Sequence, residues 1–305
     1  MTQKKIPLGG HRGMGCTDHG FYQNRDIKNL PVENTVDSVV KAFENGADYI
    51  ETDAVMSKDN ILFAIHNVVP KDHFFTPDMP PALLNKMKFA DIQKFRTGHG
   101  HNGMIQPFGE ILEAIATHDP KTLPWAVNIE IKGVQGSGQN FEANDYLDRL
   151  AQTVRESNLL PERILWSSFS LANVLAMSRH FPQSQFGMLF SEKPGPRAIY
   201  ADHQDDPRYQ YLPFNPAQID FTVRTWQAEA DERAKLGYLH PEVATITPET
   251  IARAKQYGLG INSWGLFENI DSDRRAMYDG LLNRMKENHV PFTIITDYLD
   301  EFKSA

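Results

Sequence analysis

Short apolar runs alternate with stretches of helical periodicity along almost the whole chain. Runs such as Tyr49 to Val55, Trp125 to Ile131 and Ile164 to Ser168 predict strands, whereas Glu33 to Asn45 and Leu171 to His180 predict amphipathic helices. Repeated strand–helix units predict a parallel sheet, because consecutive parallel strands need a crossover connection. About eight such units in a chain of this length favour a closed (β/α)8 TIM barrel, an α/β fold, over an open sheet.

The pattern is less regular in two places. A proline-containing segment at about residues 67–104 follows the strand predicted at Ile61 to His66 and has weaker periodicity, so it is interpreted as an insertion after the second strand. The stretch from Asp206 to Leu236 is ambiguous and is interpreted as a loop followed by a polar helix in Val223 to Lys235. Length alone does not decide the number of domains, but no linker or low-complexity tract interrupts the pattern. Residues 1–305 are therefore expected to form a single domain.

Composition limits the kinds of partner. A net charge of -8 and a sequence pI near 5.8 argue against a general binder of nucleic acids or anionic membranes. No stretch approaches the ~18 apolar residues of a membrane span, so no integral membrane segment is expected. The single Cys16 rules out an internal disulfide, and the first residues lack an apolar signal region. The plain interpretation is a cytoplasmic protein, although a chain without its export signal would look the same.

Three acidic residues fall on two predicted strands. Glu51 and Asp53 are two residues apart, which places both carboxylates on one face of a strand. Glu130 and Lys132 repeat this spacing on another strand. The three acids form a set of oxygen ligands suited to one divalent cation, Mg²⁺ or Ca²⁺ with Mn²⁺ possible, whereas zinc is disfavoured. The alternative is a set of ion pairs in the barrel interior or at its rim.

Two histidines are predicted at strand ends beside these acids. His11 and His66 would suit phosphodiester cleavage, which needs a base for the attacking oxygen and an acid for the leaving one. The alternative for either residue is structural hydrogen bonding, and His99 and His101 in a glycine-rich loop are interpreted in that way. Because catalytic groups of a (β/α)8 barrel sit at the C-terminal ends of strands, the candidates can be checked against the strand pattern. Those at or near such ends are His11, Asp53, His66, Glu130, Ser168, Trp264 and Asp297.

Other candidates would contact substrate rather than transfer protons. Arg12 and Lys132 would neutralise phosphate oxygens, with salt bridges to the acids as the alternative. Trp264 and Phe169 would form an apolar wall against the alcohol portion of a substrate, with core packing as the alternative.

These residues stand in motifs that resemble, in order, those of the glycerophosphodiester phosphodiesterase family. The likeness runs from about Leu8 to Leu299, and the ordered set is more specific than any one motif. The motifs are His-Arg-Gly at 11–13, Glu-Asn-Thr at 33–35, Gly-Ala-Asp-Tyr-Ile-Glu-Thr-Asp at 46–53, Ser-Lys-Asp at 57–59, His66, Glu-Ile-Lys at 130–132, Ser-Phe at 168–169, Asn-Ser-Trp at 262–264 and Ile-Thr-Asp-Tyr at 295–298.

The resemblance implies a (β/α)8 barrel with a small insertion between its second strand and second helix. It implies cation binding by Glu51, Asp53 and Glu130, acid–base roles for His11 and His66, phosphate contacts from Arg12 and Lys132, and support of Arg12 by Glu33. Three positions depart from the family pattern, since Asn67 replaces the usual Asp and both Gln106 and Leu299 replace Pro. The loop from Met14 to Pro31 is also longer than in short bacterial members.

The expected activity is metal-dependent hydrolysis of glycerophosphodiesters, small-molecule substrates, to sn-glycerol 3-phosphate and an alcohol. The attacking group is either water or the neighbouring glycerol hydroxyl. One alternative is a lysophospholipase D-type enzyme acting on lipids, whose apolar mouth would come from Phe74, Phe75, Met79, Leu83 and Leu84. Another is a barrel that binds phosphodiesters without catalysis, although such a protein would not need both histidines. A sugar-phosphate isomerase would share the fold alone.

Overall fold

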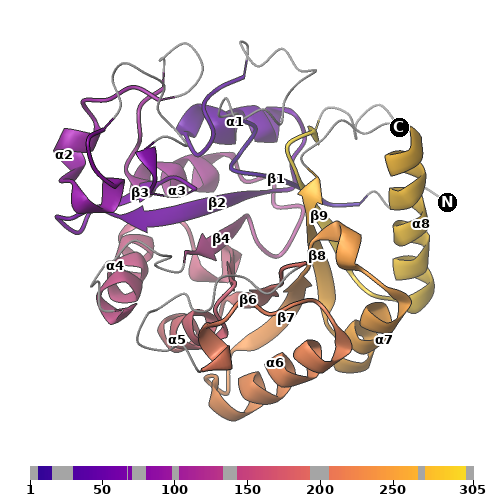
Figure 1. Cartoon of the computed structure of the whole chain (residues 1–305). Helices are drawn as coiled ribbons and strands as arrows, with labels where there is room; N and C mark the ends of the chain where they lie inside the picture. Colours follow the sequence, from indigo (N-terminus) through magenta and orange to yellow (C-terminus); the bar gives the residue numbers. More distant parts are fainter. Residues whose placement is uncertain are drawn as a thin grey trace.

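Eight parallel strands form a closed ring in this computed structural model, which describes residues 6–15, 30–66, 68–70, 80–97, 103–132, 143–192, 206–266 and 272–299. The ring runs β1-β2-β4-β5-β6-β7-β8-β9 and returns to β1 (Figure 1). Its strands are β1 (Leu8–Gly10), β2 (Tyr49–Met56), β4 (Val127–Ile131), β5 (Ile164–Ser168), β6 (Gln185–Leu189), β7 (Lys235–His240), β8 (Gly260–Leu266) and β9 (Phe292–Thr296). The predicted (β/α)8 TIM barrel is therefore confirmed.

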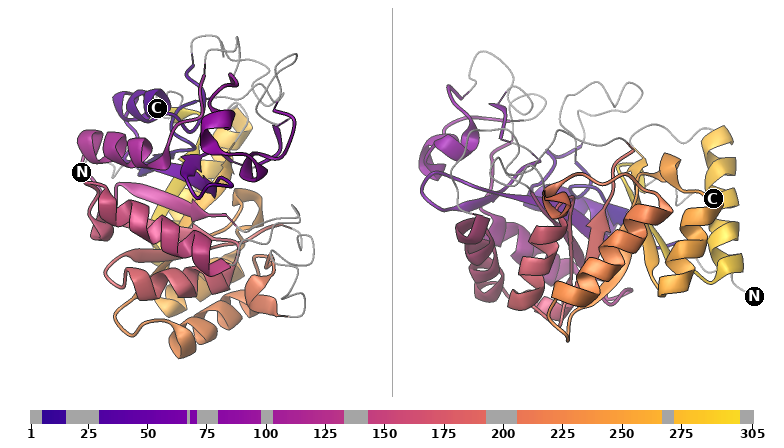
Figure 2. Two further views of the ribbon diagram at one scale, coloured as in Figure 1. Left: turned by 90° about the vertical axis from the view of Figure 1, so that its left-hand side faces the viewer. Right: turned by 60° about the horizontal axis from the view of Figure 1, so that its bottom comes forward.

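Helices connect successive ring strands and surround the barrel (Figure 2). They are α1 (Val36–Glu44), α3 (Phe108–His118), α4 (Ala143–Glu156), α5 (Leu171–His180), α6 (Pro216–Glu229), α7 (Pro248–Tyr257) and α8 (Ser272–Asn288), with the short 3₁₀ turns η5 (Pro161–Arg163), η7 (Pro207–Tyr209) and η8 (Val243–Thr245) between them. Within the described ranges, no helix is both long and apolar enough to cross a bilayer.

Capping residues fix where these helices begin. The Thr35 hydroxyl accepts a hydrogen bond from the backbone of Ser38 and starts α1. Gln106, one of the departures from the family pattern, also serves this end, because its Oε1 accepts from Val36 N at 2.7 Å. The residue that replaces the usual proline thus ties the start of α1 to the chain just before α3.

One predicted strand lies outside the ring. β3 (Leu62–Ala64) pairs with β2 in the antiparallel sense, so the expectation that His66 ends a barrel strand is wrong. The physical reason lies in the three-residue turn from Lys58 to Asn60, because a connection this short can join only antiparallel strands. Asn60 at its end takes a φ of +61°, which asparagine tolerates. The chain then continues through η3 (Leu84–Lys86) and α2 (Phe89–Ile92) before it reaches α3.

The ambiguous stretch also differs from its prediction. The helix there is α6, which begins at Pro216 after the cap residue Asn215 and ends before Lys235, where β7 starts. The expected helix over Val223 to Lys235 was therefore placed too late. Asn-Pro is a strong start signal, since Asn caps and Pro fits the first turn, and it places the start of the helix earlier than predicted.

Aromatic and aliphatic side chains close the barrel interior near the strand starts. Tyr49, Trp125, Leu165 and Ile295 form one buried cluster, with Tyr238 packed against it. Because side chains alternate along a strand, the residues two and four positions after Tyr49 on β2 lie on the same face of that strand. These are Glu51 and Asp53, so the packed interior directs the acids toward the C-terminal end of the barrel.

Candidate active site

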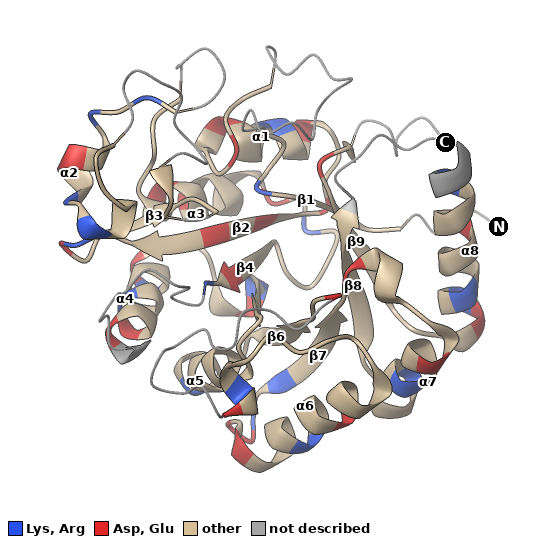
Figure 3. Ribbon diagram, in the orientation of Figure 1, with Lys and Arg blue, Asp and Glu red and all other residues tan. Residues whose placement is uncertain are grey.

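Three carboxylates meet at the C-terminal end of β2 and β4. Glu51 and Asp53 come from β2 and Glu130 from the adjacent β4, where it is in register with Asp53 (Figure 3). One oxygen of each lies within 4.8 Å of the others. The structure thus brings together the three acids that the sequence singled out as cation ligands.

Lys132 joins two of these acids. Its Nζ lies 2.8 Å from Asp53 Oδ1 and 2.8 Å from Glu130 Oε1. Burial alone would lower the pKa of Lys132, but the charges of Asp53 and Glu130 outweigh it and raise that pKa. Asp53 responds in the opposite sense: burial raises its pKa, while Lys132 and then Arg12 lower it by more. The ion pair that the sequence left open as an alternative is therefore present, within the same cluster.

Arg12 reaches the other side of the cluster from the turn after β1. Its Nη1 donates to both oxygens of Glu33 at 3.0 and 3.1 Å, and its Nε lies 3.5 Å from Asp53 Oδ2. Its backbone amide donates to Glu51 Oε2 at 3.0 Å. Arg12 takes a φ of +50°, and a side chain at the following Gly13 would overlap Ser38. The contact between Arg12 and Glu33 is the one that the resemblance implies.

His11 is held by a carboxylate that sequence reasoning gave no role. Its Nδ1 lies 2.9 Å from Oδ1 of Asp297, which follows β9, and its Nε2 lies 3.9 Å from Glu51 Oε2. Burial would lower the pKa of His11, but Asp297 reverses this and the pKa is raised. The signal for Asp297 was available in the Ile-Thr-Asp-Tyr motif, which ends a strand next to β1 in the ring.

The charges of the cluster fit a divalent cation. Burial, followed by repulsion from Asp53, raises the pKa of Glu51 to about 8, and burial also raises the pKa of Glu130. Repulsion between the carboxylates thus adds to the cost of burying them, and a cation bound by the three carboxylates would offset both. An all-oxygen donor set of this kind suits Mg²⁺, Ca²⁺ or Mn²⁺. The carboxylates in contact with Arg12, Lys132 and His11 are Glu33, Glu51, Asp53, Glu130 and Asp297.

Aromatic rings lie just after β5, on β8 and in the connection before α6. Phe169 and Trp264, the predicted apolar wall, pack edge to face with ring centroids 5.9 Å apart. Tyr211 adds a third ring 4.8 Å from Phe169. Burial, with a contribution from nearby Glu130, raises the pKa of Tyr211 to about 12, so this ring borders the charged cluster. Sequence reasoning missed Tyr211 because it lies in the stretch whose pattern was ambiguous.

A buried histidine occupies the barrel interior at the end of β7. His240 is fully buried, and neither ring nitrogen has a hydrogen-bond partner among the described residues. Burial lowers its pKa to about 3. Its ring fills the space that a side chain at Gly187 would need, while its backbone oxygen accepts a hydrogen bond from Trp264 Nε1 at 3.0 Å.

The remaining candidates come from the segment between β2 and α3. His66 is half-buried and lies two residues beyond β3, on the hairpin rather than on the ring. Leu84 is fully buried in a separate cluster with Phe63 and Phe89, so it does not line an apolar mouth. Candidates that lie outside the described residues are Asn67, Phe74, Phe75, Met79, His99 and His101.

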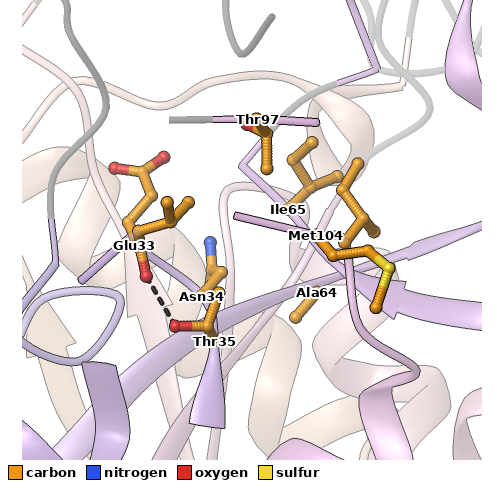
Figure 4. A pocket seen from close by; sticks show the side chains of 9 residues that line it. Glu33, Asn34, Thr35, Ala64, Ile65, Thr97 and Met104 are labelled. Atoms are coloured by element: carbon orange, nitrogen blue, oxygen red, sulfur yellow. Dashed lines mark hydrogen bonds between the residues drawn. The ribbon is translucent and has the colours of Figure 1, made fainter. Parts of the chain in front are cut away.

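A small, partly open cavity lies beside the site, between the segment before α1 and the chain around β3 (Figure 4). Glu33 and Asn34 line one side of it, and Ile65 and Met104 line the other. It borders the residues that hold Arg12 and Asp53, but the three acids themselves do not line it.

This chain resembles known phosphodiesterases in sequence. The family described as "Glycerophosphoryl diester phosphodiesterase family" matches residues 11–300. A glycerophosphodiester phosphodiesterase from Caldanaerobacter subterraneus is 25% identical over 263 residues, which cover 84% of this chain and 90% of that protein. The human glycerophosphocholine phosphodiesterase is 26% identical over 97% of this chain, which spans only 45% of that longer protein.

Solved structures share the fold. The Thermotoga maritima glycerophosphodiester phosphodiesterase superposes with a TM-score of 0.61 at 19% identity, covering 99% of both chains. An Oleispira antarctica phosphodiesterase in complex with its product sn-glycerol-3-phosphate gives a TM-score of 0.61 at 16% identity, covering 98% of this chain and 95% of the other.

Proposed function

The chain belongs to the glycerophosphoryl diester phosphodiesterase family, whose members are phosphoric diester hydrolases, and we propose that it hydrolyses glycerophosphodiesters to sn-glycerol 3-phosphate and an alcohol. The observation that carries this proposal is the convergence of three acids, two cations and a carboxylate-held histidine at the C-terminal end of the barrel. The Caldanaerobacter relative, a glycerophosphodiester phosphodiesterase, the human relative, a glycerophosphocholine phosphodiesterase, and the product bound to the Oleispira enzyme support the substrate class.

Glu51, Asp53 and Glu130 would hold one divalent cation. When bound, this cation supplies Lewis-acid stabilisation of the negative charge that develops on the phosphoryl oxygens. Arg12 and Lys132 add fixed positive charge on either side of the acids, at 3.5 and 2.8 Å from Asp53. The charged groups of Arg12 and Lys132 are oriented before substrate arrives, so they can stabilise the transition state without reorganisation. Glu33 keeps the Arg12 guanidinium in that orientation.

His11 and His66 share the two proton transfers. Cleavage forms a bond from the attacking oxygen to phosphorus and breaks the bond from phosphorus to the alcohol oxygen. One imidazole takes the proton of the attacking hydroxyl and the other gives a proton to the departing alkoxide. When His11 Nδ1 donates its hydrogen to Asp297, the lone pair is on Nε2, the nitrogen that faces Glu51. Asp297 thereby selects the tautomer that can react at the acidic cluster.

The neutral rings suit the rest of the substrate. A glycerophosphodiester has an anionic centre flanked by carbon-rich groups, and Phe169 and Trp264 offer a surface of matching polarity next to the charged residues. Of the residues that the lipid-acting alternative assigns to an apolar mouth, Leu84 is buried in its own cluster, whereas Leu83 is half-buried, so that alternative stays open.

The test measures release of glycerol 3-phosphate from glycerophosphocholine by protein stripped of metal and resupplied separately with Mg²⁺, Ca²⁺ or Mn²⁺. We expect metal-dependent turnover that falls by ~10²–10⁴ in kcat in His11→Ala and in His66→Ala. His118→Ala, which removes an exposed histidine at the end of α3, serves as the matched control and should leave turnover unchanged. Equal turnover in His11→Ala and His118→Ala would contradict the proposed role of His11. Absence of turnover with every metal would reject the substrate class.

A further inference from the structure

We propose that Asn34 is a positioning residue that holds both β2 acids of the cation site, one through its carboxamide and the other through its backbone. The inference rests on the proposed function in one respect, because it takes Glu51 and Asp53 to be cation ligands. Asn34 is 3% exposed and lies just before α1, where it lines the cavity between Glu33 and Thr35 (Figure 4).

The carboxamide fixes the orientation of Asp53. Asn34 Nδ2 donates to Asp53 Oδ2 at 3.1 Å, while the other carboxylate oxygen of Asp53 lies 2.8 Å from Lys132 Nζ. Both oxygens are therefore held, and the carboxylate cannot rotate without losing a contact. An ionised carboxylate can only accept hydrogen bonds, so the NH₂ group of the carboxamide, which is its donor, must face Asp53.

Thr52 fixes the carboxamide in turn. The Thr52 hydroxyl donates to Asn34 Oδ1 at 2.8 Å, and the side chains of both residues are buried. With its oxygen engaged in this way, the Asn34 amide presents its nitrogen to the next residue of β2. Thr52 of β2 thus orients the Asn34 carboxamide, which in turn orients Asp53, the next residue of β2.

The backbone of Asn34 acts on Glu51 through Arg12. Asn34 N donates to Arg12 O at 2.9 Å, and Arg12 N donates to Glu51 Oε2 at 3.0 Å. Arg12 is in the left-handed region, with a φ of +50°, a conformation that an arginine keeps only when neighbouring groups hold it. The hydrogen bond from Asn34 is one of those restraints, so loss of the Asn34 conformation would release Glu51 as well.

The requirement for asparagine at position 34 follows from these two contacts, the carboxamide to Asp53 and the backbone amide to Arg12. Asn34 has a φ of +56°, which asparagine and glycine tolerate but which is strained for most other residues. Glycine would preserve the backbone hydrogen bond to Arg12 but lose the carboxamide. Aspartate would tolerate the conformation but would bring an acceptor to Asp53 in place of a donor.

The experiment measures the dissociation constants of Mg²⁺ and Ca²⁺ by titration calorimetry on metal-stripped protein, together with the unfolding midpoint. The variant Asn34→Gly removes only the carboxamide and should weaken cation binding by about 10–100-fold, as expected for loss of a group that orients a ligand. Asn60→Gly is the matched control, because Asn60 also has a positive φ but lies exposed on the β2–β3 turn. Its cation affinity should equal that of the wild type.

A double-mutant cycle separates positioning from general destabilisation. Thr52→Val should weaken cation binding in the wild-type background but have no further effect in Asn34→Gly, since the hydroxyl would act only through the carboxamide. If Asn34→Gly does not fold, Thr52→Val alone must still weaken cation binding with an unchanged unfolding midpoint.

The possible failures are distinguishable. Wild-type affinity in Asn34→Gly would overturn the role of the carboxamide and leave the proposed function standing. Additive effects of the two substitutions would overturn the coupling through Thr52. A wild-type protein that binds neither cation would overturn the proposed cation site and, with it, this role of Asn34.

Discussion

The two sides of the barrel mouth are built from different chemistry. On β1, β2, β4 and β9, the functional side chains are charged, and partner charges oppose the effect of burial on the pKa of groups such as Asp53 and Lys132. On the side of β5 to β8 stand aromatic rings and His240, whose pKa is lowered by burial alone. The first side is suited to stabilising charge that develops during a reaction, whereas the second offers an apolar surface suited to uncharged groups.

This difference separates the roles of the two sides in kinetics. Changes on the charged side should act mainly on kcat, because those residues meet charge that appears in the transition state. With the proposed role of the rings in binding the uncharged part of the substrate, changes on the neutral side should act mainly on KM, because that contact would be equally strong in the ground state and the transition state.

The largest effect is expected from Asp53→Asn. This change removes the carboxylate that contacts both Lys132 and Arg12, so kcat/KM should fall by at least about 10³-fold. The fold should survive, because Lys132 keeps Glu130 and Arg12 keeps Glu33 as partners. Steady-state kinetics with glycerophosphocholine measure the loss. Asp91→Asn, which neutralises a half-exposed acid on α2, is the control, and a similar loss in both variants would contradict a specific role for Asp53.

Asp297→Asn should have the next largest effect. The substitution preserves the shape of the side chain but removes the charge that favours one tautomer of His11, so kcat should fall by about 10²-fold, the lower end of the range for general acid–base catalysis. In the background of His11→Ala the same substitution should have almost no effect, because Asp297 acts through the imidazole. Kinetics of the four proteins test this, and independent effects of the two changes would show that Asp297 acts elsewhere.

The charged side was also the more predictable one. Glu51, Asp53, Glu130 and Lys132 could be placed together because the period of two along a strand and the parallel pairing of neighbouring strands fix their directions. The ring of strands followed from the same periodicity. Local sequence is sufficient for such residues, since their partners lie on adjacent strands of one regular sheet.

Local sequence did not reveal the contact that gives Asp297 its role, and it did not reveal Tyr211 at all. Asp297 meets His11 across 286 positions when the barrel closes, and Tyr211 comes from a connection without periodicity. The error over His66 had a different origin, since the three-residue turn before β3 already excluded a parallel connection. At this point the length of the turn decides the direction of the next strand, and the apolar pattern used to predict the strand carries no information on that direction.

His240 provides a test of the neutral side through stability. Its pKa is about 3 in the folded protein and about 6.5 when exposed, so between these pH values the unfolded state binds a proton that the folded state does not. This residue therefore destabilises the fold as pH falls below about 6.5 and has no such effect above it. The loss amounts to ~2 kcal/mol on going from pH 6.5 to pH 5.0.

His240→Gln should remove that part of the pH dependence. Urea unfolding of the wild type and variant at pH 7.0 and 5.0 gives the comparison, in which the carboxylates common to both proteins cancel. The wild type should lose ~2 kcal/mol more than the variant. Equal losses would mean that the His240 ring gains a partner that keeps its pKa near the ordinary value.

The smallest effect is expected from Phe169→Leu. Leucine keeps the site apolar but cannot reproduce the edge-to-face contact with Trp264 or the contact with Tyr211, so the substrate's carbon-rich portion should bind less well. KM for glycerophosphocholine should rise about 10-fold, the scale of a small change in an apolar contact, while kcat remains within about a factor of three. Phe221→Leu, the same change on the partly buried face of α6, is the control. A fall in kcat at constant KM would break the comparison, because Phe169 would then act on the charged side, through the orientation of Tyr211 beside Glu130.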